Sequence, residues 1–422
     1  MRFRHFILTP LILTTAVAGC WLVLPADLEM KRKVPALFAA ISMLSMAVAL
    51  WLGIRPKLAD ILFGGMDKAY QWHKWLGISG LLGASLHWAL VPGPAGGDVI
   101  PAIAESGEEM GEVAMYLLLL LGCISFLRFL PYNIWHKTHQ LMGPIFLISV
   151  YHTFFSDVPF TINSLTGYVL LAISALGVGS WVYKILLYKR HINSYKVVKL
   201  VQLDGAVEVT LAPRSDKTVK HQPGQFAYVD FNLKGVNEFH PYTIASSGSG
   251  DKLVFVIRAL GDHTSELQQS IELGQTVQVD GPYGRLYKHR VHEKPQIWLA
   301  GGIGITPFLA WLKALRLNSI EQPTQEIHLF YSGEGQLFRQ FAPYLVKLQS
   351  PLQTVKLHAI DTTDKTSGRL TGEKIKQCID QPLRNYQIFA CGPKPMLKAL
   401  RSQLRQLGMN GYQWHNERFD MR

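Results

Sequence analysis

Four histidines lie in stretches apolar enough to enter a membrane, and they form two spaced pairs. His73 and His87 are 14 residues apart, and His139 and His152 are 13 apart. In a helix these spacings correspond to rises of about 21 Å and about 19–20 Å. Two helices running in the same direction would present imidazoles at two matched depths. Because an ionisable side chain within a span is costly and is by default a functional candidate, the pattern predicts two haems, each held by one histidine from each helix.

The second pair lies less favourably on its helix. Thirteen residues leave His139 and His152 roughly 140° apart on a straight helix, although Pro144 lies between them and is expected to kink it. His136 is a competing inner ligand, but 16 residues to His152 correspond to a rise of about 24 Å, which mismatches the first pair. Depth therefore favours His139. For any one of these histidines alone, an interhelical hydrogen bond is the simpler role.

A glycine-rich turn in the last third of the chain indicates a phosphate site. A strand at 297–300 leads into Gly301-Gly302-Ile303-Gly304-Ile305-Thr306-Pro307-Phe308, and a helix is expected at 309–317. Thr306 suits the N-cap and Pro307 the first helical position, and a helix N-terminus attracts a diphosphate. The spacing differs from the G-x-G-x-x-G of the Rossmann fingerprint. A second strand, at 387–390, ends at Cys391-Gly392-Pro393, a break that is often only a turn.

Between the histidines and this turn, short β-rich runs separated by turn residues predict a small antiparallel barrel. The runs are 195–201, 206–211, 225–231, 253–259 and 276–280. A further strand-like run reads His240-Pro241-Tyr242-Thr243-Ile244-Ala245-Ser246-Ser247. There a tyrosine ring can stack on a flat ligand and a threonine hydroxyl can bond its edge, although such residues are also ordinary strand formers.

The histidines must be positioned by the apolar first half of the chain, where six segments fit a bilayer core that needs about 20 helical residues. They are 6–24, 34–54, 72–91, 112–130, 137–155 and 164–188. The first also contains Val17-Ala18-Gly19-Cys20, which is similar to a lipoprotein cleavage site. Because the apolar run continues through Leu24, an uncleaved membrane helix is favoured.

Basic residues set the direction of these spans, because loops rich in Lys and Arg stay in the cytoplasm. One side carries Arg2, Arg4, Arg55, Lys57, Lys68, Arg128, Lys137, Lys184, Lys189 and Arg190. The other side holds residues 92–111, with Asp98, Glu105, Glu108 and Glu109 and no basic residue. Lys31, Arg32 and Lys33 run against the trend. Both termini are therefore expected inside, and residues 92–111 are expected to form an external loop.

The composition agrees with a membrane protein that has a water-soluble half. Of 422 residues, 48% are hydrophobic and 17% are charged, against about 25% charged in globular proteins, and mean hydropathy is +0.13. The net charge of +12 comes from scattered Lys and Arg rather than from a basic stripe, which argues against a nucleic-acid partner. The four cysteines contain no close pair, which excludes a CxxC zinc site and disfavours structural disulfides.

Taken in order, these motifs resemble the ferric reductase and NADPH oxidase superfamily over almost the whole chain. Besides the histidine spacings, the matching stretches are 223–226, 240–243, Arg258 with 261–264, 281–284, 301–308, 391–393 and 417–419. The resemblance implies three parts. Residues 1–190 would form an all-α six-helix membrane bundle that binds two haems, 191–290 an antiparallel β-barrel FAD domain of the ferredoxin-reductase type, and 291–422 an α/β nicotinamide-nucleotide domain.

The resemblance also implies roles for single residues. Tyr242 and Thr243 would hold the isoalloxazine, with Thr243 near N5, and Phe419 would cover the flavin face that nicotinamide must reach. Cys391 would lie near the nicotinamide, although a buried small hydrophobe is the simpler role, and Glu417 would belong to the same catalytic site. The other implied FAD contacts are His240 and Arg258, at or near the phosphates, with Pro241, Ser246 and Thr264. The implied nucleotide contacts are Gly301, Gly302, Gly304, Thr306, Gly392 and Pro393.

Two positions depart from the superfamily pattern. After Tyr331-Ser332, where an Arg would hold the 2′-phosphate of NADPH, the chain has Gly333-Glu334. The donor is therefore left as NADPH or NADH. Superoxide-producing animal members carry another histidine one turn beyond the outer ligand of the third helix, where this chain has Val91. That difference leaves the acceptor open between oxygen and a ferric chelate.

The combined expectation is an oxidoreductase of a bacterial inner membrane. Electrons would pass from cytoplasmic NAD(P)H to FAD, then to an inner haem (His73, His139), an outer haem (His87, His152) and an external acceptor. With imidazole on both sides of each iron, the haems would bind no gas. Oxygen, reduced to superoxide, is the expected acceptor, and a ferric chelate is the alternative. A haem-bearing membrane anchor that docks a partner without turnover is the alternative of another class.

Neither an EF-hand nor another regulatory domain is evident in the sequence. The expected partners are therefore the lipid bilayer and the electron acceptor, with no nucleic acid among them.

Overall fold

The structure is a computed structural model that describes residues 14–93, 100–127, 130–157, 162–233, 238–289, 293–364 and 368–417. The chain divides into two compact units. The first comprises mainly residues 3–59 and 68–190, and the second comprises mainly residues 60–67 and 191–422.

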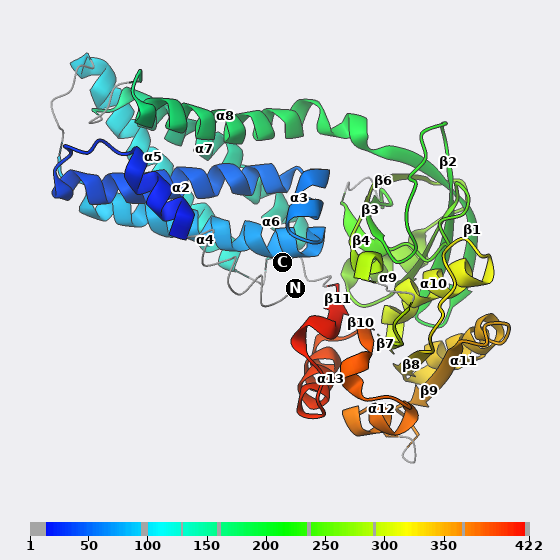
Figure 1. Ribbon diagram of the computed structural model, residues 1–422. Coiled ribbons are helices and arrows are strands. Elements are labelled where there is room, and N and C mark those ends of the chain that lie inside the picture. Colours follow the sequence, from blue (N-terminus) through cyan, green and yellow to red (C-terminus); the bar gives the residue numbers. More distant parts are fainter. Residues whose placement is uncertain are drawn as a thin grey trace. The chain divides into compact units, whose positions relative to one another are not determined.

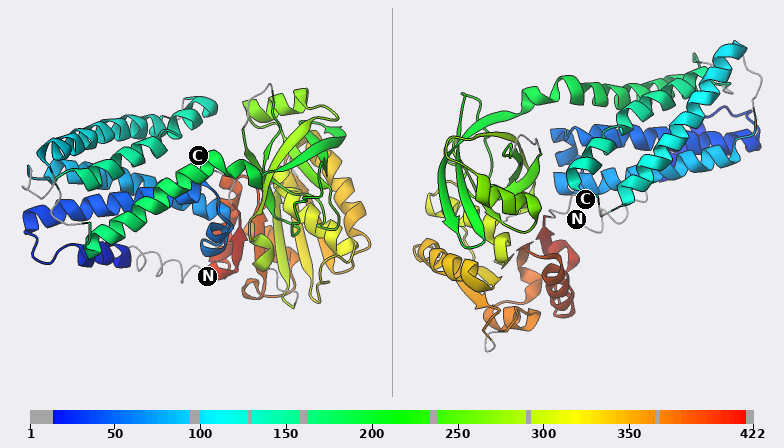
Figure 2. Two further views of the ribbon diagram at one scale, coloured as in Figure 1. Left: turned by 90° about the horizontal axis from the view of Figure 1, so that it is seen from above. Right: turned by 180° about the vertical axis from the view of Figure 1, so that it is seen from behind.

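The first unit is helical, and its long helices run side by side (Figures 1 and 2). In chain order the labelled helices are α2 (Met30–Gly53), α3 (Lys57–Leu62), α4 (Met66–Leu90), α5 (Pro101–Phe126), α6 (Tyr132–His139), α7 (Met142–Phe155) and α8 (Leu165–Leu186). Met43, Met46, Leu118 and Phe146 belong to the apolar core between them. Large apolar side chains also cover the outside, where Leu120 is 56% exposed and Leu171 48% exposed, as a lipid-facing surface requires.

Three of the described helices are long and apolar enough to cross a membrane: Met30–Gly53, Ala102–Phe126 and Leu165–Leu186. The chain is thus a membrane protein. Helix α4 has 25 residues but includes Asp67, Lys68 and Lys74, and α7 has only 14. The first expected span is described only from Thr14, as a helix at Thr14–Val23. The count of six spans therefore stays a prediction.

Two segments of this unit differ from the sequence expectation. Helix α5 begins at Pro101, so the acidic residues Glu105, Glu108 and Glu109 are helical and do not lie in an external loop. Proline at the first position and the alanines that follow favour this early start. Asp98 lies outside the described residues.

The segment expected as one helix at 137–155 is broken. Helix α6 ends at His139 and α7 begins at Met142. The ring of Pro144 would clash with the carbonyl of Gln140 in a continuous helix. Instead of the expected kink, the helix is therefore interrupted about one turn before Pro144. His139 and His152 therefore lie on different helices, and the straight-helix angle between them does not apply.

The second unit begins with a curled antiparallel sheet. Its strands are β1 (Asn193–Leu203), β2 (Ala206–Pro213), β3 (Phe226–Asp230), β4 (His240–Thr243), β5 (Leu253–Arg258) and β6 (Thr276–Tyr283). They pair in the order β4-β3-β6-β1-β2-β5, and a bridge between Ile244 and Phe255 joins the two edges. The five β-rich runs expected from the sequence are confirmed as β1, β2, β3, β5 and β6. Helix α9 (Asp262–Ser270) follows β5.

A parallel sheet completes the second unit. Its strands are β7 (Gln296–Gly301), β8 (Ile327–Gly333), β9 (Val355–Asp361), β10 (Gln387–Cys391) and β11 (Trp414–Asn416), in the order β11-β10-β7-β8-β9. The intervening helices are α10 (Thr306–Arg316), α11 (Gly335–Gln349), α12 (Gly372–Cys378) and α13 (Lys394–Gln406). One apolar core joins the barrel to this sheet, because Ala206 and Val256 pack with Trp298 and Phe308. Ligands of such sheets bind at the carboxyl ends of the strands.

Candidate functional site

The four membrane histidines meet in two pairs. His73 and His139 have ring centroids 6.0 Å apart with planes at 70°, and His87 and His152 have centroids 6.2 Å apart with planes at 62°. Helix α4 supplies one member of each pair, α6 supplies His139 and α7 supplies His152. Two metal–imidazole bonds of about 2 Å each would account for most of either separation. His136 instead lies beside Gln140, with 3.4 Å between Nδ1 and Nε2.

Three of the paired imidazoles are oriented by main-chain carbonyls. The Nδ1–oxygen distances are 2.9, 3.0 and 3.0 Å, for His73 to Ala49, His87 to Pro35 and His152 to Gly107. A carbonyl only accepts, so each Nδ1 carries the proton and each Nε2 keeps a free lone pair. The Nδ1 of His139 lies 3.4 Å from Ser125 Oγ. Metal-binding histidines are commonly oriented through their other ring nitrogen in this way, so the donor set fits iron.

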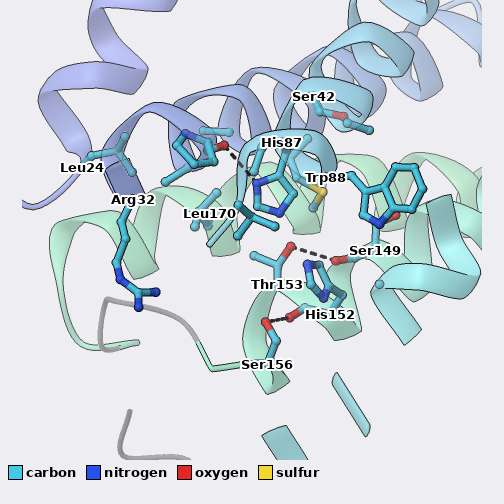
Figure 3. Close-up of a pocket in the computed structure, with 18 of the residues that line it drawn as sticks. Leu24, Arg32, Ser42, His87, Trp88, Ser149, His152, Thr153, Ser156 and Leu170 are labelled. Carbon is cyan, nitrogen blue, oxygen red and sulfur yellow. Dashed lines mark hydrogen bonds between the residues drawn. The ribbon is translucent and has the colours of Figure 1, made fainter. Parts of the chain in front are cut away.

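A cavity of about 440 Å³ surrounds the His87–His152 pair. Figure 3 shows the two imidazoles facing each other, with Trp88 at one side. Gly111 lies so close to His152 that a Cβ there would collide with the ring. The walls are mainly apolar, and Val91 is part of them. Apolar walls around two unprotonated nitrogens fit a haem.

Four charged residues also line this cavity. They are Arg32, Glu108, Glu112 and Asp157. Glu108 and Glu112 are four residues apart on α5 and therefore share one face of that helix. Glu108 and Glu112 of the acidic stretch thus belong to the wall of the cavity that contains His87 and His152.

The flavin motif lies on β4, where Tyr242 is opposite Ala227 and Thr243 is opposite Phe226. The Tyr242 ring contacts Phe231 edge-on, with centroids 5.9 Å apart. Its hydroxyl is buried and has no hydrogen-bond partner among the described residues. Burial also raises the pKa of Tyr242, so the group stays a neutral donor. An unpaired buried donor is costly, and this one fits a ligand with polar edges, as FAD has.

His240 lies beside Glu238 and His263, for which the sequence suggested no role. Its Nε2 is 3.2 Å from Glu238 Oε2, and its ring stacks on that of His263 with centroids 3.8 Å apart. Burial, and secondarily His240, lowers the pKa of His263 to about 4. His263 is therefore neutral at pH 7 and can offer a phosphate hydrogen bonds but no charge. The motif His263-Thr264 pointed to this neighbourhood, whereas Glu238 carried no sequence signal.

The hydroxyls of Ser246 and Thr264 make internal hydrogen bonds. Ser246 Oγ is 3.2 Å from His221 Nε2. Thr264 Oγ1 accepts from the main-chain nitrogens of Leu260 and Gly261, at 2.9 and 3.1 Å. Both side chains thus hold the loops next to β4 and α9, and Pro241 lies on β4 itself.

The glycine-rich turn lies at the carboxyl end of β7. It forms a 3₁₀ turn at Gly302–Ile305, and α10 follows from Thr306. The expectation of Thr306 as N-cap is wrong, because the 3₁₀ turn makes Thr306 already helical and its hydroxyl donates to the Ile303 carbonyl at 3.1 Å. A Cβ at Gly304 would collide with the Cys391 carbonyl, and one at Gly392 would lie 3.0 Å from the Gly301 backbone. Glycine therefore allows the β7 and β10 loops to touch.

A second cavity, of about 160 Å³, opens at this edge of the sheet. Its lining brings together predicted residues from four separate stretches, namely Arg258, Gly301, Gly302, Gly333, Glu334 and Pro393. Tyr331 also lines it and was not anticipated from the sequence. Its position at the carboxyl end of a strand next to the central β7 was the available signal.

Cys391 and Glu417 are both buried near this edge. Burial, and secondarily the Glu417 carboxylate, raises the pKa of the Cys391 thiol to about 12, so Cys391 is a neutral thiol rather than a thiolate. Glu417 Oε1 accepts from the main-chain nitrogens of Arg285 and Leu286, at 3.1 and 3.3 Å. Phe419 lies outside the described residues.

Three family models match successive parts of the chain. The ferric reductase like transmembrane component matches residues 38–150, an FAD-binding domain matches 192–287 and an oxidoreductase NAD-binding domain matches 298–402.

The individual relatives have low sequence identity to this chain. The anthranilate 1,2-dioxygenase electron transfer component of Acinetobacter baylyi is 27% identical over 233 residues, which cover 53% of this chain and 65% of that protein. NADPH oxidase 3 of Homo sapiens is 25% identical over 245 residues, covering 47% of this chain and 43% of that protein. The chain thus spans less than two thirds of the length of these curated relatives.

A solved structure shares the fold over most of the chain. The flavohemoglobin from Malassezia yamatoensis with bound FAD and heme covers 92% of this chain and 95% of its own, with a TM-score of 0.52 and 18% identity.

Proposed function

Because the chain belongs to the ferric reductase and NADPH oxidase superfamily, we propose that it carries electrons from NAD(P)H, through FAD and two b-type haems, to an acceptor across the membrane. Membership of this family makes the chain a membrane-linked flavin oxidoreductase that depends on NAD(P)H. The observation that carries the finer proposal is the pair of facing imidazole couples on α4, α6 and α7, with centroids 6.0 and 6.2 Å apart.

In this proposal His73 and His139 hold the inner haem, and His87 and His152 hold the outer one. When bound, each haem would supply a one-electron couple whose potential depends on its axial ligands and burial. The carbonyls of Ala49, Pro35 and Gly107 accept from Nδ1 of three of the imidazoles, so that Nε2 of each would be available to hold the iron. The protein thus provides alignment and an apolar surrounding that excludes water.

The second unit supplies the flavin and nucleotide sites. When bound, FAD would take two electrons as hydride and release them singly. Tyr242 and Thr243 would orient the isoalloxazine, and His240 would contact the phosphate end. Gly301, Gly302, Gly304 and Thr306 would accept the dinucleotide. Cys391 and Glu417 would border the nicotinamide position, as would Phe419, which lies outside the described residues. The neutral Cys391 thiol offers bulk and a weak donor without placing a second charge beside Glu417.

Oxygen is the proposed acceptor, giving superoxide. Two imidazoles on one iron would leave oxygen no position at the metal, so oxygen would collect electrons beside the His87–His152 pair. Ferric chelate reduction is the second candidate, and one observation favours it: Glu108, Glu112 and Asp157 line the cavity around His87 and His152. Carboxylates at such a mouth raise the local concentration of cations.

For the location, we propose a bacterial inner membrane with both termini and the soluble half in the cytoplasm. The basic residues Arg55, Lys57, Lys184 and Lys189 support this direction. The partners are then the bilayer and the acceptor, without nucleic acid.

The test uses purified full chain loaded with FAD and haem. Anaerobic NADH or NADPH should bleach the flavin and then reduce the haem, and admitting oxygen or a ferric chelate should reoxidise it. Comparing the two reoxidation rates separates the acceptors. A protein that binds haem and nucleotide but is not reduced would instead be a membrane anchor without turnover.

A further inference from the structure

The nucleotide cavity has an uneven distribution of charge. Among the described residues that line it, Arg258 carries the only positive charge and Glu334 the only negative one. Arg258 ends β5 of the barrel, whereas Glu334 follows β8 of the parallel sheet. The cavity is thus bordered by both domains of the second unit.

Arg258 lies against the glycine turn. An ideal Cβ built on Gly302 would be 3.3 Å from the Arg258 Nη1 atom, and Gly302 has a φ of +54°. Both facts favour glycine there. The guanidinium and the main-chain N–H groups at the start of α10 can therefore bind the same anion, the first through a bidentate fork and the second at the positive end of the helix.

Tyr331 provides a third donor to the same place. It is 0% exposed, and its hydroxyl has no hydrogen-bond partner among the described residues although it lines the cavity. Burial raises the pKa of Tyr331 and the nearby Arg258 opposes that rise, so the hydroxyl stays protonated close to the guanidinium. Stacking on Phe338, with centroids 5.3 Å apart, holds the ring in position. A buried donor of this kind requires an acceptor from a ligand.

Glu334 is presented by an anchored turn. The main-chain nitrogen and the hydroxyl of Thr362 both donate to the Gly333 carbonyl, at 2.8 and 3.1 Å. Glu334 precedes α11 but its side chain does not cap that helix. The carboxylate is therefore free of that role. A carboxylate at this strand end accepts hydrogen bonds from a ribose diol, whereas a 2′-phosphate there would be repelled.

We propose that the donor is NADH, with Arg258, Tyr331 and the glycine turn binding its diphosphate and Glu334 binding its adenosine ribose. This inference rests on the proposed function, in which a nicotinamide nucleotide occupies this cavity. It departs from the superfamily resemblance, which would give Arg258 to the FAD phosphates. FAD and NADH both carry a diphosphate, so the experiment must tell the two sources apart.

The test measures anaerobic flavin reduction by stopped flow in the full chain loaded with FAD, with bound flavin counted in each variant. For Arg258→Gln we expect the apparent Kd of both NADH and NADPH to rise about tenfold or more, with unchanged flavin content. Tyr331→Phe should raise both values a few-fold, since only one neutral hydrogen bond is lost. Arg339→Gln is the matched control, because Arg339 is exposed and does not line the cavity.

Specificity is tested at Glu334. The wild type should bind NADH at least about tenfold more tightly than NADPH, and Glu334→Arg should reverse the order by supplying a phosphate fork. Loss of flavin from Arg258→Gln, with an unchanged Kd in the fraction that keeps FAD, would overturn the proposal and return Arg258 to the FAD site. A wild-type preference for NADPH would also overturn it. Failure of both nucleotides to reduce wild-type flavin would instead contradict the proposed function.

Discussion

At the scale of single residues, the hydrogen bond at Nδ1 decides what a membrane histidine can offer. His87 and His152 each face a main-chain carbonyl through Nδ1, so Nε2 is the atom left to bind a metal. Their ring centroids are 6.2 Å apart, and among the described residues that line the cavity around them there is no further histidine.

Replacing either of them should therefore remove one haem. For His87→Leu or His152→Leu we expect half the wild-type haem content, measured by a pyridine haemochrome assay, and flavin reduction by NAD(P)H within about twofold of wild type, because the flavin and nucleotide motifs belong to the second unit and not to these helices. His136→Leu is the control and should keep both haems. Full haem content in His87→Leu would contradict the assignment, and loss of a haem in His136→Leu would make His136 the inner ligand.

The Cys391 thiol should react slowly with alkylating reagents. Its pKa is raised to about 12 by burial and then by Glu417, so at pH 8 the thiolate, which is the reactive form, is scarce. We expect iodoacetamide at pH 8 to modify the exposed Cys378 at least about tenfold faster than Cys391, as read by peptide mass spectrometry. Equal labelling of the two cysteines in the folded protein would show that Cys391 is a thiolate.

At the scale of elements, the sequence indicates the kinds of segment well but not where some of them begin. Five strands of the barrel were recognisable from β-rich runs between turns. The start of α5 at Pro101 was not, because Glu105, Glu108 and Glu109 break the apolar run. Nor was the break before α7, since a proline shows that a helix is disturbed but not how the chain turns at Gln140 and Leu141.

The same limit applies to the candidate site. The histidine spacings predicted which imidazoles pair, because helix rise is regular. Tyr331 could not be singled out, since its importance comes from the absence of a partner for its hydroxyl in a folded pocket. Likewise, Arg258 and Gly302 lie close together although they are 44 residues apart in sequence.

The two α5 carboxylates that line the cavity, Glu108 and Glu112, can be tested for attraction of a cationic acceptor. Glu108→Gln with Glu112→Gln should slow reduction of a cationic ferric complex several-fold at low salt, and 0.5 M salt should erase the difference because charges are then screened within about 4 Å. Superoxide production from neutral oxygen should stay unchanged. Glu105→Gln is the control, as Glu105 does not line the cavity. If the double variant and the wild type reduce the cationic complex at equal rates at all salt concentrations, Glu108 and Glu112 do not attract the acceptor.

Strands β8 and β9 carry a titratable network that should make the second unit acid-sensitive. His328 Nδ1 is 3.0 Å from His358 Nε2, next to Glu326 and Lys356. Burial lowers the pKa of both histidines, that of His358 to about 4. Unfolded histidine protonates near pH 6.5, so the unfolded state binds more protons below that value. The stability from this pair is complete above about pH 6.5 and is lost toward pH 4.

Thermal unfolding followed by flavin release can check this. The melting temperature should fall by several degrees between pH 7.5 and pH 5, at about 2–4 °C per kcal/mol. His358→Gln should reduce that fall, because one of the two titrating groups is gone. A variant whose melting temperature follows the wild-type pH dependence would exclude the network as its cause.

At the scale of the whole molecule, one chain joins a helical unit with two imidazole pairs to a unit with an FAD-binding and a nucleotide-binding domain. In the proposed function, the second unit takes electrons from a soluble donor and the first passes them on through its histidine pairs. Neither step alone moves an electron across a bilayer, so the proposal requires vectorial transfer by the full chain.

The most direct measurement uses the full chain, loaded with FAD and haem, in liposomes that enclose a ferric chelate and a ferrous-iron indicator. NADH added outside cannot enter and should nevertheless produce ferrous iron inside. The signal should disappear in the His87→Leu variant, whose flavin is still reduced. Interior iron that stays ferric in the wild type, while external NADH reduces the flavin, would contradict the central claim that electrons cross the membrane through the histidine pairs.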